Sequence, residues 1–598
     1  MQQMKRLREL AQLFFKMVRE EGFASTVRRL TGFLRRRLRS KKGRFVPARA
    51  VLERQRAENT AAWPKVSICT ALYNTDPRYL KEFLDSFLAQ TNQNSELCLA
   101  DASDADYAEV GEIVEAYHSD RVRYCKLAGN GGISENTNAA AKLASGSYLA
   151  LADHDDILSP DACYELAKAA AAGADFIYSD EALFDHDWLR PRVGHFKPDF
   201  APNYLLGCNY IGHIAAFPAK RFWQVGGLRA PFDGSQDHDL FFRLTEDAKQ
   251  ICHIPRVLYY WRVHAGSTSG GVGAKPYVTR ASLAAIDAHL TRTGVAGKAR
   301  EGLFPSTYKV DYTISGKPLV SVLIPNKDHI DDLTRCLDSI YGKTTWPNFE
   351  VVVVENNSAE PATFEFYKKV AVEHQNLRVV QYEGPFNFSA INNFGRKAAK
   401  GEYLVLLNND IEIITPDWIQ EMLMLAVQPK TGAVGAMLYY PDDTVQHAGV
   451  ITGLGGFAGH SHKYAHRGHS GYMFRLATVQ DFSAVTAAMM MVPAAVYDAV
   501  EGLDEGFAVA FNDVDFCLRL RRAGYAVLFT PWAQAYHCES KSRGLDKKGE
   551  AKERFDGERA RLKQRFGDVL LRDPFYSPNL TLDREDFSEA AVLPKDEQ

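Results

Sequence analysis

The chain contains an internal repeat with a spacing of 254 residues, and this duplication restricts the folds that it can adopt. The segments that begin at Lys65 (KVSICTALYNTDPRYLKEFLDSFLAQ) and Leu319 (LVSVLIPNKDHIDDLTRCLDSIYGKT) each read as a strand, a polar turn and a helix. Asp101 and Glu355 then end the next strand of each copy at the same spacing. Several features in one register predict a duplicated α/β module.

The repeat divides the chain into two domains and three other segments. We expect one α/β domain in residues 60–298 and a second in residues 318–575. The stretch between them, residues 299–317, contains several Gly and Pro residues and reads as a linker. Residues 1–59 are predicted to form a basic amphipathic helical region, and residues 576–598 an acidic, extended tail.

The composition is that of an ordinary globular protein, since 46% of the residues are apolar and 24% are charged. Residues 1–44 carry fourteen Lys or Arg against three Glu, so the rest of a chain with a net charge of −3 is acidic. An acidic main body argues against nucleic acid as a partner. Scattered cysteines, no secretory signal and no apolar stretch of membrane-spanning length predict a cytoplasmic protein.

Acidic residues directly follow a buried strand in the first domain. The sequence YLALADHDDILSP, residues 148–160, runs from apolar residues into Asp153 and Asp155. The matching sequence of the second domain, YLVLLNNDIE, carries the triplet Asn408-Asn409-Asp410. One reading is a solvated turn before a helix. The other is a divalent-cation site at the carboxyl end of a central strand, where open α/β sheets bind ligands.

Two further motifs recur late in each domain. DGSQDHDLFFRL places Asp237 at the predicted start of a helix, and AFNDVDFCLRLRRAGY places Asp513 at the corresponding point. YYWRVHAGSTS contains Arg262 and His264, and AYHCESKSRG contains His537. An aspartate at a helix start either stabilises the helix dipole or serves as a general base, and a strand-end Arg or His either faces solvent or binds a ligand.

Together these motifs resemble those of the inverting family-2 glycosyltransferases, over roughly 500 residues of the chain. The pattern is similar to that of tandem-domain enzymes that build bacterial surface polysaccharides such as O-antigen or capsule. The resemblance implies two GT-A domains, each with a mostly parallel, Rossmann-like sheet and a nucleotide-sugar at the strand ends. It also implies a bifunctional enzyme that extends a surface glycan on a lipid-linked acceptor.

By this resemblance, each domain has a catalytic base, metal ligands and residues that hold the donor, a UDP- or dTDP-sugar. The bases are Asp237 and Asp513, and the ligands for Mg²⁺ or Mn²⁺ are Asp155, His264, Asp410 and His537. The donor-binding residues are Thr70, Tyr73, Asp101, Asp153, Arg262, Pro325, Glu355, Asn408 and Asn409. A hard cation stabilises a leaving diphosphate, and inverting transfer needs one base and no covalent intermediate.

The second domain departs from the family pattern in three places. Glu355 stands for the usual aspartate, Asn408 replaces the first acid of the Asp-x-Asp motif, and Asn512 precedes the base. The sequences LLNND and NDVDFCLRLRRAGY resemble rhamnosyltransferase-like members, so dTDP-rhamnose is a candidate donor. The alternative is a degenerate domain that only holds the acceptor.

Two segments allow more than one reading. The sequence HAGVITGLGGFAGHSHKYAHRGH suggests either a zinc site or, because of its glycines, a lid over the second active site. The basic N-terminus has apolar stripes at helical spacing, which is typical of a helix on an anionic membrane surface or one docked on a protein. The membrane reading places the protein at the inner face of the cytoplasmic membrane. A single-activity enzyme and a non-catalytic glycan-binding assembly protein are the other functions to consider.

Overall fold

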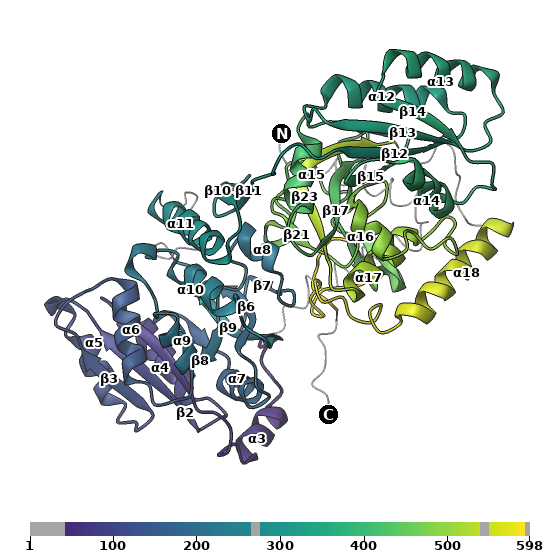
Figure 1. Ribbon diagram of the computed structural model, residues 1–598. Helices are drawn as coiled ribbons and strands as arrows, with labels where there is room; N and C mark the ends of the chain where they lie inside the picture. Colours follow the sequence, from purple (N-terminus) through teal and green to yellow (C-terminus); the bar gives the residue numbers. More distant parts are fainter. Residues whose placement is uncertain (1–41, 265–275, 539–548, 592–598) are drawn as a thin grey trace, which may run out of the picture.

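The computed structural model describes residues 42–264, 276–538 and 549–591 (Figure 1). The predicted amphipathic segment at residues 1–41 lies outside the described residues, and the described chain begins with a turn and helix α3 (Arg49–Ala57). Two α/β domains follow, coloured purple to teal and green to yellow in Figure 1. Among the described residues, no helix combines the length and apolarity needed to cross a bilayer.

The first domain is built on a nine-stranded sheet in the order β3-β2-β1-β4-β8-β6-β9-β5, with β7 paired to β6. Strands β1 to β4 are mutually parallel, and β8 runs antiparallel to both β4 and β6. The strands are β1 (Val66–Leu72), β2 (Ser95–Asp101), β3 (Val122–Lys126), β4 (Tyr148–Leu151), β5 (Ile157–Leu158), β6 (Phe176–Phe184), β7 (Val193–His195), β8 (Ala215–Pro218) and β9 (Ile251–Arg262).

Helices pack against this sheet through apolar residues at helical spacing. In α4 the Asp76 side chain accepts a hydrogen bond from the Arg78 amide and Pro77 occupies the first turn, so the helix start is fixed locally. Leu80 and Phe83 are among its buried residues. The helices are α4 (Pro77–Leu88), α5 (Glu109–Ala116), α6 (Ile133–Leu143), α7 (Ala162–Ala171), α8 (Pro202–Gly207), α9 (Ala219–Gln224), α10 (Gln236–Thr245) and α11 (Pro276–Thr293).

The second domain repeats this topology, with the sheet order β14-β13-β12-β15-β22-β17-β23-β16. Its strands are β12 (Val320–Asn326), β13 (Phe349–Glu355), β14 (Leu377–Gln381), β15 (Tyr403–Leu407), β16 (Ile411–Ile413), β17 (Thr431–Tyr439), β18 (Val445–His447), β19 (Val450–Thr452), β20 (Ala458–His460), β21 (Gln480–Asp481), β22 (Met489–Pro493) and β23 (Ala526–His537). Its helices are α12 (Ile330–Lys343), α13 (Pro361–Glu373), α14 (Phe388–Ala398), α15 (Trp418–Ala426), α16 (Ala494–Ala499), α17 (Asn512–Arg522) and α18 (Gly549–Phe566). The same order of equivalent strands confirms the predicted duplication.

A buried hydrogen bond explains the serine that both copies carry in the first strand. Ser67 Oγ donates to Glu96 Oε1 at 2.6 Å, and Ser321 Oγ donates to Glu350 Oε1 at the same distance. Each pair ties the first strand to the second near its amino end. A buried carboxylate needs such donors, because an unpaired one is strongly destabilising.

A glycine closes the same corner in each domain. The amides of Gly146 and Gly401 donate to Ser67 Oγ at 3.0 Å and Ser321 Oγ at 2.8 Å. A Cβ on Gly146 would lie 2.6 Å from the carbonyl oxygen of Lys65, and one on Gly401 would lie 2.6 Å from the Ser321 amide. The glycines in ASGSYLAL and AKGEYLVL therefore reflect a close backbone approach that no side chain fits.

The segment predicted to be a linker contains an antiparallel hairpin. Strands β10 (Gly297–Glu301) and β11 (Tyr308–Tyr312) pair along their full length. Tyr308, Val310 and Tyr312 are buried, and β11 contacts both α8 of the first domain and α15 of the second. The Gly and Pro residues therefore mark the bend of a hairpin that packs on both domains.

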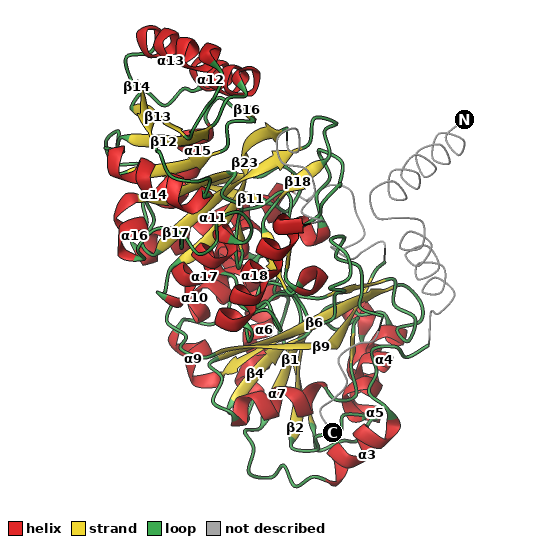
Figure 2. Cartoon of the chain, turned by 90° about the vertical axis from the view of Figure 1, so that its right-hand side faces the viewer, coloured by secondary structure: helices red, strands yellow, loops and turns green. Residues whose placement is uncertain are grey.

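The acidic tail is folded, so the expectation of an extended chain is wrong for residues 576–591. Tyr576, Leu580 and Phe587 are buried, and Asn579 Nδ2 donates to Asp180 Oδ2 of the first domain at 2.8 Å. The acidic residues of this tail favour an extended chain, but the apolar residues spaced between them are buried. These side chains fill the junction of the domains, whose sheets lie in the lower and upper parts of Figure 2.

The two domains also meet directly. Asp481 of β21 accepts hydrogen bonds from the Asn203 amide at 2.9 Å and from Asn203 Nδ2 at 2.8 Å. Arg475 is buried beside Tyr204, with its guanidinium carbon 5.4 Å from the ring centroid. Buried polar groups that are satisfied only across the junction favour one relative arrangement of the domains.

Candidate active sites

An aspartate and a histidine meet at the end of the central strand in the first domain. Asp155 follows β4, and its Oδ2 lies 2.7 Å from Nε2 of His264, which follows β9. Tyr259 holds the turn that contains Asp155, because its OH donates a hydrogen bond to Asp156 Oδ2 at 2.6 Å and accepts one from the Asp153 amide at 2.9 Å. Asp156 is thus structural, whereas Asp155 faces the histidine.

Arg262 holds the backbone of this turn. Its Nε donates to the Asp155 carbonyl oxygen at 2.6 Å, and its Nη2 forms an ion pair with Glu82 at 2.6 Å. The guanidinium lies over Tyr79 and Phe184, and the side chain is only 3% exposed. The contact between Arg262 and the donor phosphates stays a prediction, and the hydrogen bonds that Arg262 makes within the protein shape the Asp155 turn.

Asp153 lies close enough to Asp155 and Asp237 for their negative charges to act on its carboxyl group. Desolvation raises the pKa of Asp153. The nearby His213 acts to lower this pKa, whereas the negative charges of Asp155 and Asp237 act to raise it. His213 Nε2 lies 3.5 Å from Asp153 Oδ2, and its ring stacks on Tyr259. Mutual repulsion of this kind is relieved by a bound cation.

The predicted base Asp237 lies in the first turn of α10. Its Oδ2 accepts a hydrogen bond from Asn209 Nδ2 at 2.7 Å, so the carboxylate is oriented by a neighbouring loop. Asp239, two residues later, is fully buried and binds Arg229 and Arg243. Asp239 therefore has a structural role, whereas Asp237 remains half-buried at the site.

The predicted nucleobase residues lie at the ends of β1 and β2. Asp101 is buried and accepts from the Ser103 amide at 2.8 Å, Tyr124 OH at 2.8 Å and Lys126 Nζ at 2.9 Å. Burial opposes ionisation, but the hydrogen bonds outweigh it and lower the pKa of Asp101. Thr70 is buried in β1, while Tyr73 in the following turn is exposed. The structure thus leaves Tyr73 accessible and engages Asp101 within the protein.

The second domain contains an equivalent aspartate and histidine. Asp410 Oδ1 lies 3.2 Å from His537 Nε2, and Asn408 Nδ2 lies 3.3 Å from the same nitrogen. His537 Nδ1 lies 2.6 Å from Gln446 Oε1, which orients the ring. Burial opposes ionisation of Asp410, but the hydrogen bond with His537 prevails and its pKa is lowered.

The other predicted donor residues of this domain are held by internal hydrogen bonds. Asn409 Nδ2 donates to Asn326 Oδ1 at 2.6 Å, beside Pro325 at the end of β12. Glu355 at the end of β13 is buried and accepts from Ser358 and Tyr367 OH, each at 2.6 Å. Glu355 therefore resembles Asp101 in its full engagement by the protein.

Asp513 takes the position of Asp237 at the start of α17. Its Oδ2 accepts from the Ala487 amide at 3.2 Å, and its Oδ1 accepts from the Val514 amide at 2.9 Å. Burial raises the pKa of Asp513 despite these hydrogen bonds. A carboxylate with a raised pKa is a stronger base once it is ionised.

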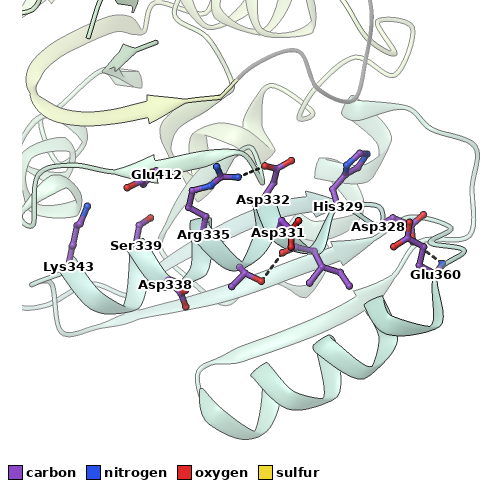
Figure 3. Close-up of a pocket in the computed structure, with 12 residues that line it drawn as sticks. Asp328, His329, Asp331, Asp332, Arg335, Asp338, Ser339, Lys343, Glu360 and Glu412 are labelled. Carbon is purple, nitrogen blue, oxygen red and sulfur yellow. Dashed lines mark hydrogen bonds and ion pairs between the residues drawn. The ribbon is translucent and has the colours of Figure 1, made fainter. Parts of the chain in front are cut away.

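A cavity of about 1190 Å³ lies along α12 beside this site (Figure 3). Arg335, Lys343 and Glu412 are among its lining residues, and Arg335 pairs with Asp332. The positive charge of Arg335 also helps to lower the pKa of Asp410. None of the predicted site residues lines this cavity in the part of the chain that is described, so it adjoins the Asp410 site without containing it.

The histidine-rich segment does not assemble a zinc site within the described ranges, where no group of three or more His, Cys, Asp or Glu is placed to hold a metal. His447 and His460 instead bond to each other, and His462 bonds to Ser461 and the Tyr472 amide. The zinc reading is therefore unsupported. In both sites the described metal-ligand candidates form an Asp–His pair.

Four side chains that contact these groups were not among the predicted site residues: Asn209, His213, Tyr259 and Gln446. None belongs to the motifs that drew attention to the sites. The repeat carries a signal for Asn209 and His213. It makes β8 the equivalent of β22, and both strands run antiparallel to the central strand of their domain, so residues 209–213, which precede β8, lie beside the carboxyl end of β4. Tyr259 and Gln446 carry no local signature.

Comparison with known proteins gives concordant results. The chain is 42% identical over 532 residues to "Uncharacterized protein y4gI" of Sinorhizobium fredii, covering 88% of this chain and 58% of that protein. It is 34% identical over 545 residues to "O-antigen biosynthesis protein RfbC" of Myxococcus xanthus, covering 90% and 42%. The chain thus spans about half the length of these relatives.

Among solved structures, the mannosyltransferase PcManGT from Pyrobaculum calidifontis, in complex with GDP-Man and Mn²⁺, is 17% identical with a TM-score of 0.30, covering 39% of this chain and 60% of that one. The family model "Glycosyl transferase family 2" matches residues 67–222 and 321–494, which together exceed half of the chain. With one match in each of two domains of the same GT-A-like topology, the chain belongs to glycosyl transferase family 2.

Proposed function

We propose that the chain is a bifunctional inverting glycosyltransferase in which each domain transfers one sugar from a nucleotide diphosphate donor. One observation carries the proposal. Each domain places an Asp–His pair at the end of its central strand and an aspartate in the first turn of a later helix. A protein that only bound glycans would need no base at either helix.

The residues of the first domain account for the proton and the bond changes. The Asp237 carboxylate takes the proton of an acceptor hydroxyl while that oxygen attacks the anomeric carbon of the donor sugar. The bond from this carbon to the diphosphate oxygen breaks on the opposite face, so the configuration inverts. Asn209 holds the base in place during this step.

The residues present fit Mg²⁺ or Mn²⁺. Asp155 and His264 would hold the ion in the first domain with Asp153 nearby, and Asp410 and His537 would hold it in the second. Few protein ligands suit an ion that also binds phosphate oxygens and water. When bound, the ion neutralises charge on the leaving diphosphate. The like-charge cluster of the first domain supports this assignment.

The donors proposed are UDP- or dTDP-sugars, with dTDP-rhamnose as a candidate for the second domain. The acceptor proposed is a lipid-linked bacterial surface glycan at the inner face of the cytoplasmic membrane. Support comes from the similarity to a protein named for O-antigen biosynthesis, which is longer than this chain, and from the basic sequence at residues 1–44.

A single-activity enzyme is the second candidate. Asn408 of the second domain replaces the carboxylate that Asp153 supplies in the first, which weakens the attraction for a cation. In this reading the second domain holds the acceptor. Retention of Asp410, His537 and Asp513 in one site favours the bifunctional reading.

Release of nucleoside diphosphate tests the proposal. A panel of UDP- and dTDP-sugars is assayed with Mg²⁺, Mn²⁺ or EDTA and a membrane-extract acceptor, using the wild type, Asp237→Asn and Asp513→Asn. We expect each variant to lose turnover of a different donor, while Asp583→Asn on the exposed tail surface stays at the wild-type rate. Unchanged turnover in Asp513→Asn would leave the second domain as a scaffold, and a wild type that is silent with every donor would overturn the enzyme assignment.

Membrane binding is tested by sedimentation with liposomes. Deletion of residues 1–41 removes most of the basic residues of the N-terminal segment 1–44 yet keeps Arg44, which pairs with Glu589. We expect the deletion to abolish sedimentation with anionic liposomes, and neutral liposomes to bind neither protein. Equal sedimentation of both proteins with anionic liposomes would contradict the proposal.

A further inference from the structure

Two histidines of the second domain share a hydrogen bond that the proposed chemistry leaves unused. Nδ1 of His447 in β18 lies 2.8 Å from Nδ1 of His460 in β20, and the rings meet edge to face. His447 is fully buried, whereas His460 is half-buried. Only one of the two Nδ1 atoms can carry the shared hydrogen.

The surrounding amides decide which nitrogen carries it. Nε2 of His447 accepts hydrogen bonds from the amides of Gly449 at 3.3 Å and Thr486 at 3.4 Å, so it bears a lone pair. A neutral imidazole with a lone pair on Nε2 carries its hydrogen on Nδ1. His447 is therefore the donor and His460 the acceptor, which leaves the hydrogen of His460 on Nε2. Burial lowers the pKa of both rings, that of His460 to about 4, so both are neutral at pH 7.

The pair lies between the two halves of the second active site. Thr486, which donates to His447, precedes Ala487, whose amide donates to the base Asp513. Gln446, which precedes His447, orients His537 of the metal-binding pair. His460 lies close enough to His537 for its charge to act on the His460 ring. In the described part of the chain, Nε2 of His460 has no hydrogen-bond partner.

We infer that Nε2–H of His460 donates a hydrogen bond to a sugar oxygen in the second active site, with His447 as a positioning residue that fixes the tautomer. This inference rests on the proposed function. Because Nδ1 of His460 accepts the hydrogen of a buried partner, Nε2 of the neutral ring presents a donor and no acceptor. It selects an oxygen with a free lone pair at that position, and a substrate with a methyl group or hydrogen there leaves the donor unpaired.

The kinetic test is made in the Asp237→Asn background, in which only the second domain can turn over its donor. We expect His460→Ala to lower kcat/KM by about tenfold or more and His460→Gln, which keeps an N–H donor, to recover most of the loss. His466→Ala, at an exposed histidine of the same segment, is the matched control and stays at the parent rate. If only the KM for the acceptor rises, the oxygen belongs to the acceptor. If the KM for the donor also rises when donor hydrolysis is measured without acceptor, the oxygen belongs to the donor. Unchanged kinetics in His460→Ala would overturn the inference.

A spectroscopic test is independent of turnover. In the full chain labelled with ¹⁵N-histidine, long-range ¹H–¹⁵N spectra distinguish the two tautomers, and His447→Gln and His460→Gln assign the signals. We expect His447 in the Nδ1–H form and His460 in the Nε2–H form, with His460 Nε2 shifting on addition of UDP- or dTDP-sugars or the acceptor extract. If the Asp237→Asn enzyme proves silent, the proposed function of the second domain fails and these spectra decide the inference. An Nδ1–H form of His460, or no shift with any probe, overturns it.

Discussion

Nε2 of His264 lies 2.7 Å from Oδ2 of Asp155 at the carboxyl end of β4. Asp410 and His537 repeat the pair in the second domain at 3.2 Å, although Asn408 there replaces the carboxylate of Asp153. The duplicated chain thus retains the acid and imidazole of the site and varies the residue two positions earlier. This difference predicts unequal cation affinity in the two domains.

Replacement of Asp155 or Asp410 by Asn is expected to remove the response of one domain to Mn²⁺ or Mg²⁺. Each variant keeps the shape of the side chain but loses the charge that attracts the cation. We expect turnover of the corresponding donor to fall at least a hundredfold, about 2.7 kcal/mol of transition-state stabilisation. Diphosphate release during metal titration measures the effect, with Asp106→Asn on the exposed surface as control. Normal metal activation in both variants would exclude these ligands.

Arg262→Met is expected to disturb the first domain alone. The substitution preserves most of the buried volume but removes the hydrogen bond to the Asp155 carbonyl oxygen and the ion pair with Glu82. Loss of a buried charged donor costs about 1–3 kcal/mol of stability. We expect a lower melting temperature and a lower turnover of the first donor, with the second donor unaffected. Arg190→Met, at an exposed arginine, serves as control. A fall in donor affinity without any loss of stability would instead favour direct phosphate binding by Arg262.

The Ser67–Glu96 pair predicts a specific pH dependence of stability. Burial opposes ionisation of Glu96, but hydrogen bonds from Lys65, Ser67 and Ser145 lower its pKa from 4.5 to about 2. A carboxyl whose folded-state pKa is depressed stabilises the fold above its unfolded pKa and loses that contribution as the pH falls from 4.5 towards 2.

Glu96→Gln is therefore expected to lower the free energy of unfolding at pH 7 by about 1.5–3 kcal/mol, the range for hydrogen bonds to charged groups. The difference from the wild type narrows as the pH falls from 4.5 towards 2, because the carboxyl of the unfolded chain takes up its proton first and that of the folded chain only near pH 2. Urea unfolding between pH 7 and pH 3 measures it, with Glu112→Gln at an exposed helix position as control. A difference that does not depend on pH would show that the charge of Glu96 is immaterial.

Asn579→Ala is expected to weaken the junction of the domains. Asn579 Nδ2 donates to Asp180 Oδ2 and to the Pro255 carbonyl oxygen, each at 2.8 Å, and Asp180 is fully buried. A buried acceptor that loses its donor costs about 1–3 kcal/mol. Calorimetry should show the transition of the first domain moving to lower temperature and separating from that of the second. Asp583→Ala, at an exposed tail residue, should leave the profile unchanged. A calorimetric profile of Asn579→Ala identical to that of the wild type would mean that this contact of the tail adds nothing to domain coupling.

The sequence predicts the topology and the central site residues because both are expressed locally. The repeat aligns equivalent strands, and the strand-end rule places Asp155 and Asp410 without knowledge of any distant contact. The orientation of side chains is a different matter. The donor contact of Arg262 stays a prediction, but its partner Glu82 lies 180 residues earlier, and this pairing is set by the packing of α4 against β5, the neighbour of β9. The tail escapes prediction for the same reason, since its apolar residues find their partners only when both domains are assembled.

The contact between Asn579 and Asp180 spans 399 residues of sequence, and this separation governs how the protein matures. During translation the first domain leaves the ribosome with Asp180 lacking its last donor. At a synthesis rate of about 5–20 residues per second, the asparagine follows only about 20–80 s later. The nascent chain therefore folds its first domain well before that domain can acquire its fixed orientation to the second.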